Sequence, residues 1–69
     1  MTTVKELREE AGLTPTQLAA LAGVSYQTAY KVEHGEPVTR VYVKAVLGAL
    51  SEKLGQVIKE SDVSGLAII

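Results

Sequence analysis

The chain has 69 residues, of which 46% are hydrophobic and 22% charged, and its formal net charge is −1. This length allows one domain with a small core, in which a pocket large enough for an enzyme hardly fits. The sequence has no cysteine, which excludes disulfides and thiolate metal sites, and no apolar run approaches the roughly 20 residues that span a bilayer.

A first helix is predicted near the N-terminus. Apolar side chains recur there at helical intervals: Val4, Leu7 and Ala11. Thr2 or Thr3 can cap the start of this helix, and Gly12 stands where helices commonly end. The opening stretch MTTVKELREE is charged and lacks the apolar centre of a secretory signal, so we expect a cytoplasmic protein.

A second helix begins with the clearest start signal in the chain. Thr14 stands at the cap, Pro15 at the first helical position and Gln17 three residues after the cap, which is the capping-box pattern. The helix ends at Gly23. Its apolar residues are Leu18, Ala19, Leu21 and Ala22.

A third helix follows after a very short connection. Ser25 caps it, its inward residues are Ala29 and Val32, and the pair His34-Gly35 ends it. The connection AGVS, residues 22–25, leaves room only for a tight corner between the two helices.

Such a corner needs small residues and a backbone free to turn. Gly23 can take a positive φ without a Cβ clash, Ala19 lets the backbones approach, and Val24 fills the interior. The combined spacing predicts a helix-turn-helix over about residues 15–34.

The second half of the chain predicts a longer helix and a short strand. Pro37 follows in a loop, Thr39 can cap a fourth helix, and Gly48 and Gly55 each weaken it by about 1 kcal/mol relative to Ala. Its wide apolar face comprises Val43, Ala45, Val46, Leu47, Ala49 and Leu50, with a continuation through Leu54, Val57 and Ile58. The final segment SGLAII, which is apolar and β-branched, predicts a short β-strand. The predicted fold is therefore all-α, a compact bundle of four to five short helices in one domain over residues 1–69.

The stretch LREEAGLTPTQLAALAGVSYQTAYKVEHGEPV resembles the helix-turn-helix domains of the Cro and phage-repressor type, also called the XRE family. The resemblance covers residues 3 to about 54. It implies a lambda-repressor-like, DNA-binding transcriptional regulator without a cofactor, which acts as a homodimer on a palindromic operator with helix 25–33 in the major groove. It also implies a structural ion pair between Arg8 and Glu33 instead of DNA contacts by either residue.

The exposed start of helix 25–33 carries side chains suited to base edges. A Gln27 amide can bond adenine N6 and N7, and a Lys31 amine can donate to guanine O6 and N7. By resemblance, Tyr26, Gln27 and Lys31 occupy base-reading positions. A second group is assigned to the DNA backbone: Thr16, Ser25, Thr28, Tyr30 and Arg40. Tyr30 also has the alternative of touching a thymine methyl group, and Arg40 is expected in the loop before the fourth helix.

Two departures from the family pattern reduce the expected affinity. Pro15 replaces a Gln that often opens the second helix, and Glu36 stands where relatives often carry Lys or Arg. The net charge is +1 over residues 14–50 and −1 on either side. Each subunit would neutralise about two to three phosphates, so binding should require a dimer.

The sequence carries no pattern typical of an enzyme or a metal site. His34 has no second His or Cys to share a metal, no nucleophile is paired with a base, and no glycine loop cradles phosphate, so no enzyme is expected. The tail, residues 60–69, has three interpretations: it folds back as extra core, it pairs with a second subunit, or it binds another protein. The last makes a protein-interaction module, such as the antitoxin of a toxin–antitoxin pair, the alternative function.

Overall fold

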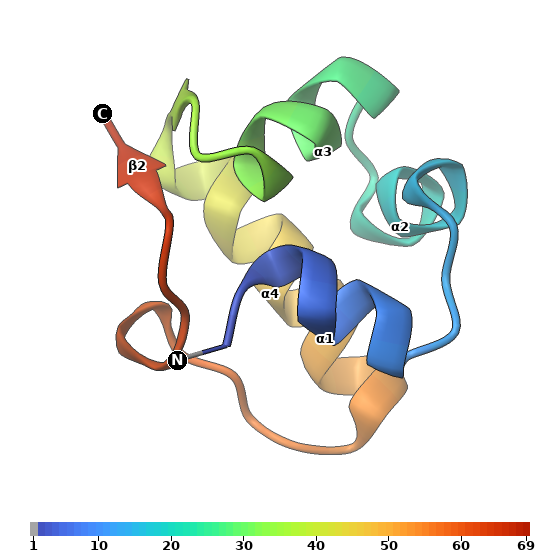
Figure 1. Ribbon diagram of the computed structural model, residues 1–69. Helices are drawn as coiled ribbons and strands as arrows, with labels where there is room; N and C mark the ends of the chain where they lie inside the picture. The colour runs from blue at the N-terminus through green and yellow to red at the C-terminus, as the bar shows by residue number, and fades with distance from the viewer. Residues whose placement is uncertain (1) are drawn as a thin grey trace.

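The computed structural model describes residues 2–69, which form four α-helices and a small two-stranded sheet (Figure 1). The helices and strands are α1 (Val4–Glu10), α2 (Pro15–Ala22), α3 (Tyr26–Glu33), β1 (Pro37–Val38), α4 (Arg40–Leu54), the 3₁₀ turn η1 (Glu60–Asp62) and β2 (Ala67–Ile68). The helical bundle and the C-terminal strand confirm the predicted fold class. Within residues 2–69, every helix is too short or too polar to cross a membrane.

The first two helices both start with a capping box, of which the one at Thr14 was predicted and the one at Thr3 was predicted only as a cap. The Thr14 N–H donates to Gln17 Oε1 at 2.9 Å, and the Gln17 N–H donates back to Thr14 Oγ1 at 3.1 Å. Thr3 and Glu6 make the equivalent pair of bonds at the start of α1. These reciprocal bonds satisfy N–H groups that lack an intrahelical partner, which explains why both starts were readable from sequence.

The corner between α2 and α3 is built on Gly23. Its backbone is left-handed, with φ 71° and ψ 29°, and the N–H of Val24 donates to the Ala19 carbonyl at 3.0 Å. This geometry ends α2 and redirects the chain within three residues. Ala19 is buried, so the two helices approach closely at this end.

Helix α4 forms the centre of the core. It packs against α1, α2 and α3, and its residues Val46 and Leu50 are fully buried together with Leu18 of α2. Gly48 lies on the exposed side of α4 and does not interrupt it. The helix nevertheless ends at Gly55, so the predicted continuation through Val57 and Ile58 is wrong. Both lie beyond the helix, Val57 exposed and Ile58 partly buried against the core.

The predicted apolar group on α2 also needs a correction. Leu18 and Ala19 are buried and Ala22 packs against the core, but Leu21 points to solvent. A helix as short as α2 presents only one face to α4, and Leu21 lies outside that face. Three buried residues outside the helices, which the sequence pattern did not single out, complete the core instead: Leu13, Val38 and Val63.

The C-terminal segment folds back onto the domain, as the first of the three interpretations of the tail proposed. Strand β2 lies parallel to β1, with Pro37 opposite Ala67 and Val38 opposite Ile68. Figure 1 shows the segment returning along the edge of the bundle to reach the α3–α4 connection. The expectation that Pro37 lies in a plain loop is therefore wrong, because the returning tail supplies a partner strand.

The left-handed corner predicts that substitutions at Gly23 and Gly48 change stability in opposite directions. Gly23→Val should destabilise the protein by about 1–3 kcal/mol, because a β-branched residue is strained at positive φ. Gly48→Ala should stabilise it by about 0.5–1 kcal/mol, because a Cβ there meets open space inside a helix. Urea unfolding followed by circular dichroism measures both, and a Gly23→Val variant as stable as the wild type would contradict this description of the corner.

Candidate nucleic-acid interface

Helix α3 buries one face and exposes the other. Ala29 and Val32 are buried against the core. The exposed face carries Tyr26, Gln27, Tyr30, Lys31 and His34. The three predicted base-reading residues therefore lie together on the solvent side of this helix.

The start of α3 is organised by two hydroxyl groups. Ser25 Oγ accepts a hydrogen bond from the Thr28 N–H at 3.1 Å, and the two side-chain oxygens lie 2.9 Å apart. Both residues thus occupy the cap region that the sequence indicated. The remaining free N–H groups and the helix dipole make this end electropositive, which favours a nearby phosphate.

An aromatic ladder runs along one edge of the exposed face. The rings of Tyr26 and Tyr30 lie 6.4 Å apart, and the Tyr30 ring stacks on His34 at 3.9 Å with an interplanar angle of 17°. The His34 Nδ1–H donates to the Tyr30 carbonyl at 2.9 Å, which fixes the imidazole under the tyrosine. Tyr26 and Tyr30 are 50% and 43% exposed, so neither ring serves mainly as core.

A shallow concavity of about 490 Å³ lies on this face. Tyr26, Gln27, Tyr30 and Lys31 line it from α3, and Glu36 closes it from the connection to β1. The concavity thus joins both tyrosines to the amide and the amine that can read base edges. Glu36, one of the two departures from the family pattern, is part of this surface.

A partly buried ion pair ties α3 to α1. Arg8 donates to Glu33 from Nε at 3.1 Å and from Nη2 at 2.9 Å, and its Nη1 donates to the Leu13 carbonyl at 2.9 Å. The side chains of Arg8 and Glu33 are only 12% and 5% exposed. The hydrogen bonds and charge of Glu33 raise the pKa of Arg8 despite its burial. This bidentate pair holds the last turn of α3 in place and leaves neither residue free for DNA.

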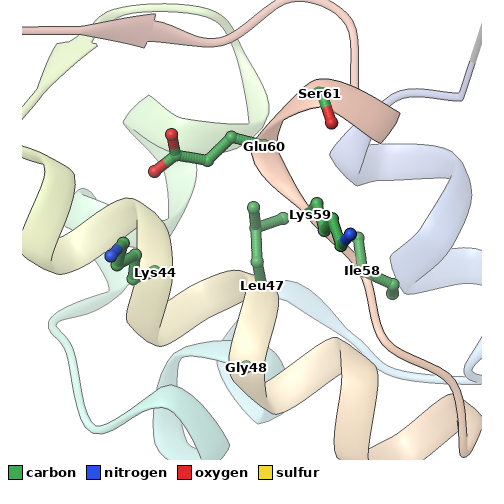
Figure 2. A pocket seen from close by; sticks show the side chains of 7 residues that line it. All are labelled: Lys44, Leu47, Gly48, Ile58, Lys59, Glu60 and Ser61. Atoms are coloured by element: carbon green, nitrogen blue, oxygen red, sulfur yellow. The ribbon is translucent and has the colours of Figure 1, made fainter.

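Arg40 is the first residue of α4, and its expected position in the loop is wrong. Its Nε lies 3.5 Å from Glu60 Oε2, with side chains 61% and 27% exposed. Figure 2 shows Glu60 reaching from η1 toward α4, beside a cavity of about 470 Å³ that Lys44 and Leu47 line from α4. Sequence analysis missed Glu60, because only the return of the tail brings it to Arg40.

The other candidate contacts lie at the surface. Thr16 is exposed in the first turn of α2, directly after Pro15. Lys44 is exposed one turn beyond Arg40 on α4. Thr16, Arg40 and Lys44 are therefore all accessible to a ligand. The charge of Arg40 is already partly offset by Glu60.

This arrangement, a corner-linked helix pair with an outward polar face on the second helix, defines a helix-turn-helix DNA-binding fold. A family described as helix-turn-helix matches residues 4–57. The chain belongs to this family, the Cro/C1-type or XRE family that the sequence resembles, and is a DNA-binding transcription regulator. No curated protein and no solved structure matches it.

The ion pair predicts that removing Glu33 destabilises the protein more than removing an exposed glutamate. Glu33→Ala should destabilise the protein by about 2–3 kcal/mol, because it leaves the Arg8 guanidinium poorly hydrated and without its counter-charge. Glu10→Ala, which removes an exposed carboxylate from α1, should change stability by less than about 0.5 kcal/mol. Thermal unfolding at constant ionic strength compares the two, and equal losses would show that the pair contributes nothing specific.

Proposed function

We propose that the protein is a repressor that binds a palindromic operator as a homodimer, with α3 of each subunit in the major groove. One observation carries the proposal. The helix after the corner buries Ala29 and Val32 and exposes Gln27 and Lys31, whose groups match adenine and guanine edges. A repressor of this kind acts by occupying its operator.

Each candidate residue has a role in this proposal. Gln27 bonds adenine, Lys31 donates to guanine, and Tyr26 contacts a base beside them. The proposed phosphate contacts come from the starts of three helices, where hydroxyls and a guanidinium lie: Thr16, Ser25, Thr28 and Arg40. Contacts of this second group position the protein on the duplex without reading sequence. Tyr30, the remaining candidate, contacts either the backbone or a thymine methyl group.

The small number of cations supports a dimer. Lys31, Arg40 and Lys44 are the basic residues on or beside the proposed surface, and Glu36 and Glu60 lie next to them. One subunit then releases about two to three counterions, which gives weak binding at physiological salt. Two subunits on one palindrome add their contacts, which is the symmetry that such operators mirror.

An exposed apolar surface supports the same assembly. Tyr42 and Ile69 are 47% and 80% exposed and line one small cavity beside β1, which Thr28 and Lys31 of α3 also line. Exposed apolar side chains that lie together are typical of protein-binding surfaces. The same surface favours the second candidate function, in which the protein binds another protein as an antitoxin binds its toxin.

Reversal of one charge tests the DNA-binding face. Lys31→Glu should weaken association with duplex DNA by about tenfold or more at low salt, because a base-reading cation becomes an anion facing phosphate. Lys53→Glu is the matched control, since it makes the same charge change about 20 Å from Arg40 at the other end of α4. It should leave binding nearly unchanged.

Fluorescence anisotropy over a salt series measures both variants, and the mass of the complex gives the number of chains per duplex. Two chains per palindromic duplex agree with the proposal. If the wild type fails to associate with any duplex at low salt, DNA binding through α3 is wrong and the protein-binding candidate is favoured.

The contact between Arg40 and Glu60 predicts a gain of affinity. Glu60→Gln should tighten DNA binding by about twofold to fivefold, because the carboxylate attracts Arg40 and repels the phosphate that Arg40 would contact. Glu52→Gln makes the same charge change elsewhere on the chain and should have a smaller effect. In an Arg40→Gln background the Glu60 change should have a smaller effect, because only the repulsion of phosphate remains, and an undiminished effect there would exclude this coupling.

A further inference from the structure

The exposed face of α3 consists of two parallel ridges of different chemistry. Tyr26, Tyr30 and His34 follow one another at four-residue spacing and form an aromatic ridge. Gln27 and Lys31, also four residues apart, form a polar ridge beside it. The concavity of about 490 Å³ is lined by both ridges.

The aromatic ridge is ordered before any ligand arrives. Stacking on His34 at 3.9 Å and the His34 bond to the Tyr30 carbonyl restrict the Tyr30 ring. A ring that is exposed and already ordered loses little entropy when an apolar group packs on it. The ridge therefore presents a prepared apolar surface on the face that would enter the groove.

Base pairs present one kind of apolar group in the major groove, the methyl on C5 of a pyrimidine, which in unmodified DNA belongs to thymine. We propose that the aromatic ridge reads this thymine methyl group, so that Tyr30 contacts a base and not the backbone. This inference rests on the proposed function, since it requires α3 to lie in the major groove.

The neighbouring ridge supports thymine as the source of the methyl group. Gln27 and Tyr30 lie three residues apart on the same helix face and line one concavity. An A·T pair offers adenine N7 and N6 at one end of its major-groove edge and the thymine methyl at the other. An amide beside a ring matches that edge, so the two ridges together select A·T pairs.

The concavity has no net positive charge with which to hold a phosphate. Lys31 and Glu36 both line it, so one cation is offset by one carboxylate, and the carboxylate would face the phosphate oxygens if the DNA backbone lay there. A methyl group carries no charge and is not repelled. The departure from the family pattern at Glu36 is thus compatible with base contact at Tyr30.

Substituted DNA tests the inference on the full chain. A duplex is first selected from random sequences by binding to the protein, and each thymine in it is then replaced by uracil, which removes only the methyl group. Affinity should fall about fourfold for each methyl that packs on the ridge. In a Tyr30→Ala variant the same replacement should have no effect.

Two variants separate the ridges. Gln27→Ala should keep the uracil penalty and lose sensitivity to 7-deazaadenine, which lacks the N7 acceptor. Tyr30→Phe keeps the ring and should keep the uracil penalty. A Tyr30→Phe variant that binds every duplex more weakly, with no uracil penalty in the wild type, would overturn the inference and indicate a hydroxyl contact to the backbone.

Methylated cytosine distinguishes the second source of a C5-methyl group. If the protein reads thymine, replacing the cytosines of the selected duplex by 5-methylcytosine, with every thymine kept, should leave affinity unchanged. Tighter binding to that DNA without a uracil penalty would overturn the assignment to thymine. If the protein binds the selected duplex equally well with thymine and with uracil, only this inference is refuted. If it fails to bind any duplex, the proposed function is refuted as well.

Discussion

The left-handed backbone at Gly23 sets the direction in which α3 leaves α2, and the proposed interface depends on that direction. With φ at 71°, the chain turns within three residues, and the exit angle brings Ala29 and Val32 onto the core. Because those two residues face inward, the residues on the opposite side of the helix, Gln27 and Lys31 among them, face outward. Which face of α3 is presented to solvent is thus a geometric consequence of one backbone conformation.

One turn alone would leave the far end of α3 free to pivot, and the ion pair between Arg8 and Glu33 prevents this. The guanidinium holds Glu33 by two hydrogen bonds and the Leu13 carbonyl by a third, so it joins α1, the α1–α2 loop and the last turn of α3. On the other side, β2 pairs with β1 directly after α3. The helix is therefore fixed at its start by the corner, at its end by the ion pair, and beyond its end by the returning tail.

Local signals account for what the sequence could predict. The starts at Thr3, Thr14 and Ser25 and the end at Gly23 depend on contacts within a few residues, and these were readable as caps. The pairing of Pro37 with Ala67 and the contact of Arg40 with Glu60 join residues 20 or more positions apart, and no local pattern encodes them. The ion pair between Arg8 and Glu33 is equally distant in sequence, and the family resemblance alone made it predictable.

The exposed face of α3 combines few charges with much apolar surface, and this balance determines how such a protein can select DNA. Phosphate contacts weaken steeply with salt, and here Glu60 already offsets Arg40 while Glu36 lies beside Lys31. Contacts between an aromatic ring and a methyl group involve no counterions and persist as salt rises. As the salt concentration rises, the uncharged contacts therefore supply a larger share of the binding free energy. If α3 binds DNA as proposed, we expect a surface of this composition to discriminate between base pairs more than it attracts DNA in general, because it offers few of the sequence-independent phosphate contacts.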